Sequence, residues 1–218
     1  MKRTLFMIAS MGWAISMFSV SSIFAGEDKL VHLPDPQADG GRPLMQVLKD
    51  RSSSRSFSSE KLPAQTLSNL LWAAFGINRP DTGKRTAPSA MDRREIDIYV
   101  ATDEGLYLYE AKGNALKLIM PGDIRSLTGR QDFVKEAFVN LIYVADFSRM
   151  GNSTKEDKEF YSAADTGFIS QNVYLYCASE RLATVVRGSI DRQALAKVMK
   201  LRPEQKIILA QSVGYPKR

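Results

Sequence analysis

Two arginines flank three serines in the stretch RSSSR, residues 51–55. A guanidinium can bind a phosphate through two parallel N–H groups, and serine hydroxyls add further donors. The stretch follows residues 43–50, PLMQVLKD, where a leading proline and the apolar spacing predict a short helix. An anion site after this helix is one interpretation, and a solvated loop is the other.

A stiff turn precedes a core strand. It is formed by RTAPSA, residues 85–90, where Pro88 fixes its own φ and favours an extended conformation for the residue before it. The backbone N–H groups of Ser89 and Ala90 can then be held toward a ligand. An ordinary turn into the strand is the alternative. The same two interpretations apply to residues 185–188, VVRG, where a strand ends at a glycine.

Several classes of chemistry are excluded by composition. His32 is the only histidine and Cys177 the only cysteine, so a His/Cys metal site, a Ser-His triad and an intramolecular disulfide are not expected. We expect no metal, a buried and inert thiol at Cys177, and a solvated His32. The net charge of +6 is scattered along the chain, which argues against nucleic-acid binding.

Apolar alternation predicts the strands. Residues 95–102, EIDIYVAT, and 105–111, GLYLYEA, are separated by a short acidic turn and are expected to form an antiparallel hairpin. A nearly continuous apolar run at 139–146 predicts a central strand. The other strands are expected at residues 116–120, 182–188 and 206–215.

Helical periodicity predicts four further elements after the first short helix. Residues 63–76 begin at a proline, end at a glycine and carry an apolar stripe. Residues 155–182 are expected to form a long core helix, and shorter helices are expected at 132–138 and 191–200. The buried stripe of the long helix is predicted to be Ala164, Phe168, Gln171, Leu175, Ala178 and Leu182. The pattern indicates one α+β domain around a mixed sheet.

The first 25 residues have the layout of a secretory signal peptide, with cleavage expected near Ala25. An uncleaved membrane anchor is the alternative. Cleavage would lower the net charge from +6 to +4, because Lys2 and Arg3 are the only charged residues removed. We expect a flexible leader at 26–42, a folded domain at 43–218, and a periplasmic or secreted protein with no stable membrane anchor.

The order of these stretches along the chain is more informative than any one of them. RSSSR, LSNLLWAAFGINRP, RTAPSA, GFISQNVYLYCASERLATV and VGYPK occur in this order between residues 43 and 218. Together they resemble the nitroreductase superfamily of FMN-dependent flavoproteins, and most closely its short branch that includes the SagB-type dehydrogenase domains. The resemblance implies an α+β fold with a mainly antiparallel sheet flanked by helices, a long central helix, and an intertwined homodimer with FMN at two interface sites.

The resemblance also implies the cofactor site. The matching residues are Arg51, Ser52, Ser53, Arg55, Pro88, Ser89, Ala90, Asp92, Arg187, Gly188, Lys217 and Arg218. Those of the RSSSR stretch would hold the phosphate, with Ser52 in a variable position. The Pro88–Ala90 turn would approach the flavin ring from the partner subunit. Arg187 and Gly188 would lie beside flavin N5, and Arg187 is the one candidate for a catalytic, tuning role.

Two matches are less regular. Lys217 or Arg218 would stand in for a family cation near the phosphate. Asp92 occupies a position where many family members have asparagine, so its carboxylate would either accept the flavin N3–H or face solvent.

The activity implied is hydride transfer through flavin N5 by a ping-pong mechanism, with a small-molecule donor and acceptor. The reaction would be nitro or quinone reduction, or a SagB-like substrate oxidation. Export makes a cytoplasmic nicotinamide donor less suitable. A flavin-binding or flavin-scavenging protein without turnover is the alternative, and a dimeric interaction module is a third interpretation.

Overall fold

The computed structural model describes residues 29–217. Seven of its strands form one sheet in the order β1-β6-β5-β4-β7-β9-β8. Every neighbouring pair in this sheet is antiparallel, which confirms the α+β fold with a mainly antiparallel sheet; no parallel pair occurs among the described strands. The strands are β1 (Leu30–His32), β4 (Ile96–Ala101), β5 (Gly105–Glu110), β6 (Ala115–Pro121), β7 (Val139–Asp146), β8 (Ala183–Arg187) and β9 (Gln205–Gly214).

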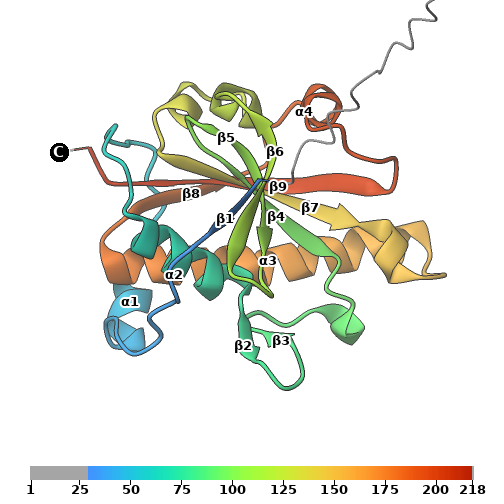
Figure 1. Cartoon of the computed structure of the whole chain (residues 1–218), viewed down its shortest axis with the longest axis horizontal. Coiled ribbons are helices and arrows are strands. Elements are labelled where there is room, and N and C mark those ends of the chain that lie inside the picture. Colours follow the sequence, from blue (N-terminus) through green and yellow to red (C-terminus); the bar gives the residue numbers. More distant parts are fainter. Residues whose placement is uncertain (1–28, 218) are drawn as a thin grey trace, which may run out of the picture.

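Helices cover both faces of the sheet (Figure 1). On one face lie α1 (Leu44–Asp50), α2 (Ala64–Phe75) and the long α3 (Lys155–Glu180), and on the other lies α4 (Arg192–Val198). A small hairpin of β2 (Ile77–Arg79) and β3 (Lys84–Arg85) projects from the lower end of the domain. The short 3-10 helices are η1 (Ala90–Asp92), η2 (Arg125–Thr128), η3 (Asp132–Lys135) and η4 (Phe147–Met150).

Most of the expected elements are confirmed. All eight residues of β7 are buried, as a strand at the centre of a doubly covered sheet requires. The hairpin of β4 and β5 forms as predicted, and β6 extends it. Asp191 caps α4 by accepting a hydrogen bond from the Ala194 N–H. The helix expected at 132–138 is only a 3-10 turn.

The buried face of α3 differs from the prediction. Phe168 is 49% exposed, and Gln171 is also exposed. The side that packs under the sheet carries small and polar residues together with apolar ones, namely Ser162, Asp165, Thr166, Ile169, Ser170, Val173, Tyr174 and Cys177. Small side chains allow the helix to approach the sheet closely, so apolarity alone did not identify the inner face. The buried thiol of Cys177 is confirmed.

The segment expected to be a flexible leader contributes a strand. β1 pairs with β6 at the edge of the sheet, with His32 opposite Ala115. The expected signal segment and Arg218 lie outside the described residues. Within residues 29–217, the structure has no helix with the length and apolarity needed to cross a membrane.

Candidate functional site

Residues 51–58 form an extended strip beside β8 and the chain after β9. The Ser54 N–H donates to the Thr184 carbonyl at 2.9 Å, and the Ser58 N–H donates to the Tyr215 carbonyl at 2.9 Å. Phe57 is buried and forms a bridge with Pro216. Backbone contacts at both ends therefore hold this strip, which we call the 51–58 strip, in a fixed position.

The 51–58 strip carries cations without acidic partners. Among residues 29–217, no carboxylate forms an ion pair with Arg51, Arg55 or Lys217. Lys217 joins the strip because its N–H donates to the Ser56 carbonyl at 3.4 Å. Three of the residues predicted to bind a phosphate thus lie on or beside this strip, and none of them forms an ion pair with a described carboxylate.

Tyr174 of α3 ties the strip to β8. Its hydroxyl shares a 2.9 Å hydrogen bond with Ser53 Oγ and accepts the Val186 N–H at 2.9 Å. Its ring lies 5.3 Å below the Arg51 guanidinium carbon, within the range of a cation–π contact. Sequence reasoning missed Tyr174, because its place in a helical pattern predicts core packing and gives no signal of this bridging role.

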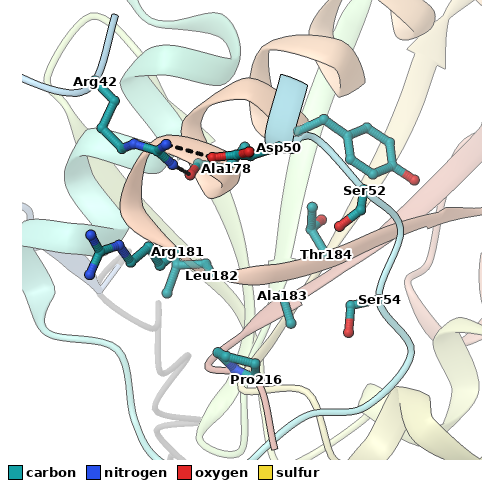
Figure 2. A pocket seen from close by; sticks show the side chains of 11 residues that line it. Arg42, Asp50, Ser52, Ser54, Ala178, Arg181, Leu182, Ala183, Thr184 and Pro216 are labelled. Carbon is teal, nitrogen blue, oxygen red and sulfur yellow. Dashed lines mark hydrogen bonds and ion pairs between the residues drawn. The ribbon is translucent and has the colours of Figure 1, made fainter. Parts of the chain in front are cut away.

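A cavity of about 500 Å³ lies against the same strip (Figure 2). Ser52 and Ser54 line it, and on another side Arg42 donates to Asp50 and to the Ala178 carbonyl. Arg181 stands at its edge with a left-handed backbone that ends α3. The hydroxyls of Ser52 and Ser54 are therefore available to a polar ligand.

Two buried carboxyl groups, those of Asp165 and Glu95, form hydrogen bonds with the Pro88–Ala90 turn. The Ala90 N–H donates to Asp165 Oδ2 at 2.9 Å, and Ser89 Oγ donates to Glu95 Oε2 at 3.2 Å while accepting the Arg94 N–H at 2.8 Å. Glu95 is fully buried and Asp165 is nearly so. Burial and the neighbouring Asp165 raise the pKa of Glu95 above its ordinary value.

The turn and the 51–58 strip do not meet within one chain. The turn contacts α3 at Asp165 and the strip contacts it at Tyr174. These positions are nine residues apart on the helix, which corresponds to about 14 Å along the axis. The two predicted halves of the cofactor site are thus brought to different parts of the same helix.

Arg187 lies in the interior of the protein. Only 4% of the residue is exposed, and its guanidinium donates to the Thr128 carbonyl at 2.7 Å and to Asn140 Oδ1 at 2.7 Å. Burial lowers its pKa to about 10. The side chain thus fastens η2 and β7 to the end of β8, while Gly188, the next residue, is exposed. A direct tuning role for the Arg187 guanidinium stays a prediction.

Asp92 is exposed and bound by its neighbour Arg94. Its two carboxylate oxygens accept hydrogen bonds from Arg94 Nε at 2.7 Å and Nη2 at 2.6 Å. The bond from Arg94 is the main reason why the pKa of Asp92 lies below its ordinary value. In this chain the Asp92 carboxylate therefore has an internal partner beside the turn.

Replacing Glu95 by glutamine is expected to flatten the pH dependence of stability. The folded protein keeps the Glu95 proton above the ordinary pKa of 4.5, so the free energy of unfolding falls as pH rises from there through the raised pKa. Each unit of pKa difference corresponds to about 1.4 kcal/mol, and Glu95→Gln removes this titration. Thermal melts between pH 4.5 and 8 would show it, with exposed Glu204→Gln as the control. Parallel curves for wild type and Glu95→Gln would contradict the prediction.

Replacing Tyr174 by phenylalanine is expected to loosen the 51–58 strip. The variant leaves the Val186 N–H without its partner, which should lower the free energy of unfolding by about 1–2 kcal/mol. Urea denaturation measures the loss, and amide hydrogen exchange at Val186 should quicken. Tyr161→Phe on the same helix is the matched control, because its hydroxyl forms no hydrogen bond with the described residues. Equal stability of the two variants would refute the bridging role.

Comparisons with known proteins agree on one family. The sequence model of the nitroreductase family matches residues 48–215. The crystal structure of a candidate nitroreductase from Ralstonia eutropha JMP134 is 43% identical, covers 87% of this chain and 90% of its own, and superposes with a TM-score of 0.83.

Two more distant relatives extend the comparison. A candidate nitroreductase of Methanocaldococcus jannaschii is 27% identical over 187 residues, which are 81% of this chain and 92% of that protein. A candidate nitroreductase from Desulfovibrio desulfuricans, solved in complex with FMN, shares the fold with a TM-score of 0.59 and 21% identity, over 82% of this chain and 89% of that one.

Proposed function

Because this chain belongs to the nitroreductase family of oxidoreductases, we propose that it binds FMN and transfers hydride between a small-molecule donor and a small-molecule acceptor. The resemblance found in the sequence is thereby confirmed at the level of the family. The substrate pair, the ping-pong order of the reaction and a SagB-like direction of electron flow belong to the proposal.

The observation that carries the proposal is the unpaired charge of the 51–58 strip. Arg51 and Arg55 lie on a backbone fixed by β8 and the Tyr215–Pro216 segment, and Lys217 joins them. Two guanidiniums and an ammonium suit a phosphate monoester, since charge-assisted hydrogen bonds to phosphate oxygens are strong. The donor set therefore fits the phosphate end of FMN.

The protein groups have two tasks in the proposed reaction, to hold the cofactor by its phosphate and to fix the backbone beside its ring. Bound FMN would carry the hydride chemistry at its N5 atom. Arg51, Ser53 and Arg55 would bind the phosphate and so fix the position of the cofactor. Tyr174 holds the Val186 backbone in place, and this strand end would lie beside the flavin together with Gly188.

A homodimer would complete the site. The Pro88–Ala90 turn and the 51–58 strip contact α3 at separate positions, and the family resemblance assigns the turn to the partner's cofactor, so we propose that it approaches the cofactor of a second copy. Large apolar side chains are exposed on helices α1 and α3, with Met45 at 75%, Leu44 at 60% and Phe160 at 67%. Such exposure is typical of an interaction surface.

Reconstitution of the purified chain with FMN tests the proposal. A flavin spectrum that stays with the protein through gel filtration, at the elution volume of a dimer, is the expected result. Anaerobic mixing with NADH, NADPH and dithionite should then bleach the flavin with at least one reductant, and a nitroaromatic or quinone should restore it. Absence of flavin binding would overturn the proposal. Binding and bleaching without turnover on any acceptor would favour the flavin-scavenging alternative.

We also propose export to the periplasm or medium, on the basis of the signal-like segment before Gly26. Cell fractionation and N-terminal sequencing of the recovered protein test this. A start at Gly26 in the exported fraction is expected, and a cytoplasmic protein that retains Met1 would refute it.

A further inference from the structure

A small basic pocket lies between the β2–β3 hairpin and the Pro88–Ala90 turn. Its volume is about 200 Å³. Four cationic side chains line it, and Asp92 is the one acid among the lining residues. The cations are Arg79, Lys84, Arg85 and Arg94. Pro88 and Ser89 form part of its wall, so the pocket shares a side with the turn.

Most of this positive charge is not neutralised. Arg94 is paired with Asp92, but Arg79 donates only to neutral acceptors, Asn78 Oδ1 at 3.0 Å and the Arg85 carbonyl at 2.7 Å. Within residues 29–217, no carboxylate forms an ion pair with Arg79, Lys84 or Arg85. The pocket therefore has an excess of three positive charges over its single carboxylate.

Arg85 is partly removed from water and incompletely satisfied. Its guanidinium lies 4.5 Å from the centre of the Phe75 ring, and Nη1 donates to the Phe75 carbonyl at 2.9 Å. Its Nε is buried and has no acceptor among the described residues. Burial is the largest cause that lowers the pKa of Arg85, and the nearby Arg94 adds to it. An anion in the pocket would relieve this crowding of positive charge.

Asp92 is the carboxylate that lies among the cations of this pocket. Besides Arg94, the charges of Lys84 and Arg79 lower its pKa, so all three cations lie within electrostatic reach of one carboxylate. Met91, Asp92 and Arg94 have positive φ angles of 54°, 53° and 52°, a conformation that non-glycine residues adopt at a cost. The surrounding contacts thus keep the Asp92 carboxylate at the pocket although the backbone there has an unfavourable conformation.

We propose that this pocket binds the oxyanion group, a carboxylate or a phosphate, of the small molecule that is oxidised or reduced. The inference rests on the proposed function, because the pocket adjoins the turn that would approach the flavin. It assigns the substrate a class: a small molecule with an anionic end, which Arg79, Lys84 and Arg85 bind while the rest of the molecule extends toward Ser89. Asp92 competes with it for the same cations.

Isothermal titration of 4-nitrobenzoate and of its neutral methyl ester into the FMN-loaded protein tests this, and 4-nitrophenyl phosphate separates phosphate from carboxylate recognition. The carboxylate is expected to bind at least about tenfold more tightly than the ester, which corresponds to about 1.4 kcal/mol, and added salt should reduce the difference.

The double variant Arg79→Gln, Lys84→Gln should lose this preference. Asp92→Asn should bind the anions several-fold more tightly, since it removes the competing charge and keeps the shape. Lys112→Gln, a cation outside the pocket, is the control.

Equal affinity for acid and ester, wild-type affinity in the double variant, or weaker binding by Asp92→Asn would each overturn the inference. Thermal melts confirm that the variants are folded. The same titrations on flavin-free protein test the pocket without the cofactor. Anion binding without FMN binding would refute the proposed function but would still support the pocket as an anion-binding site. FMN binding without a preference for the anionic ligand would support the proposed function but refute the assignment of this pocket.

Discussion

Replacing Arg187 by alanine is expected to lower the free energy of unfolding by about 3–5 kcal/mol, because the buried Thr128 carbonyl loses its donor, at roughly 1–3 kcal/mol, and the truncation leaves a buried cavity, at about 2–5 kcal/mol. The guanidinium supplies the Thr128 carbonyl and hydroxyl and the Asn140 side chain, all in the buried interior. Domains are commonly stable by about 5–15 kcal/mol, so this one truncation removes a large share. Urea denaturation followed by circular dichroism measures the change.

Two further variants separate this network from the loss of an arginine in general. Arg181→Ala removes an exposed guanidinium at the end of α3 and should change stability by less than about 0.5 kcal/mol. Gly129→Ala keeps Arg187 but places a Cβ 2.0 Å from its Nη1, so it should destabilise the protein through the same contact. Wild-type stability of Arg187→Ala or of Gly129→Ala would show that the network contributes little.

Replacing Arg51 and Arg55 together by glutamine is expected to weaken FMN binding more than 100-fold. Each charge-assisted hydrogen bond to the phosphate is worth roughly 1.5–3 kcal/mol, so the pair contributes about 3–6 kcal/mol. Fluorescence quenching of FMN during titration gives both dissociation constants. Neither guanidinium has a carboxylate partner among the described residues, so the fold should tolerate the change.

The matched control removes two charges from the opposite end of the sheet. Lys112 follows β5 and Lys206 lies at the start of β9, and both are exposed. The double variant Lys112→Gln, Lys206→Gln should keep wild-type affinity, which shows that general surface charge is not responsible. If riboflavin, which has no phosphate, loses as much affinity as FMN in the Arg51→Gln, Arg55→Gln variant, the phosphate assignment is wrong.

The sequence predicted most strands and helices because their signals are local. β7 is buried on both faces, and its apolar run shows this directly. The orientation of α3 was not predictable in the same way. Its apolar residues Phe160 and Phe168 are exposed, whereas Asp165 and Ser162 face the sheet. The spacing of apolar residues along a helix is the same whether that face packs in the core or forms an interaction surface.

The candidate site was only partly predictable, because long-range contacts decide what lies together. The RSSSR stretch could be identified as a candidate anion site from its residue types. The bridge by Tyr174 between Ser53 and Val186 depends on three distant segments, which no local pattern reveals. The basic pocket likewise joins β2–β3 residues to the Pro88–Ala90 turn. The interior hydrogen bonds of the Arg187 side chain to Thr128 and Asn140 were likewise not predictable from its local sequence, and its place beside a ligand stays a prediction.

The order of the strands has a consequence for how the chain folds. β9 is inserted between β7 and β8, and Asn140 meets Ser212 across 72 residues of sequence. Contacts so distant in sequence are expected to slow folding, because a long loop must close before they form. Until β9 is available, β7 and β8 lack a common neighbour, and the sheet cannot be assembled. A chain that remains unfolded during its synthesis is a suitable passenger for a translocation channel that threads extended polypeptides, and pulse-chase folding assays would reveal such a delay.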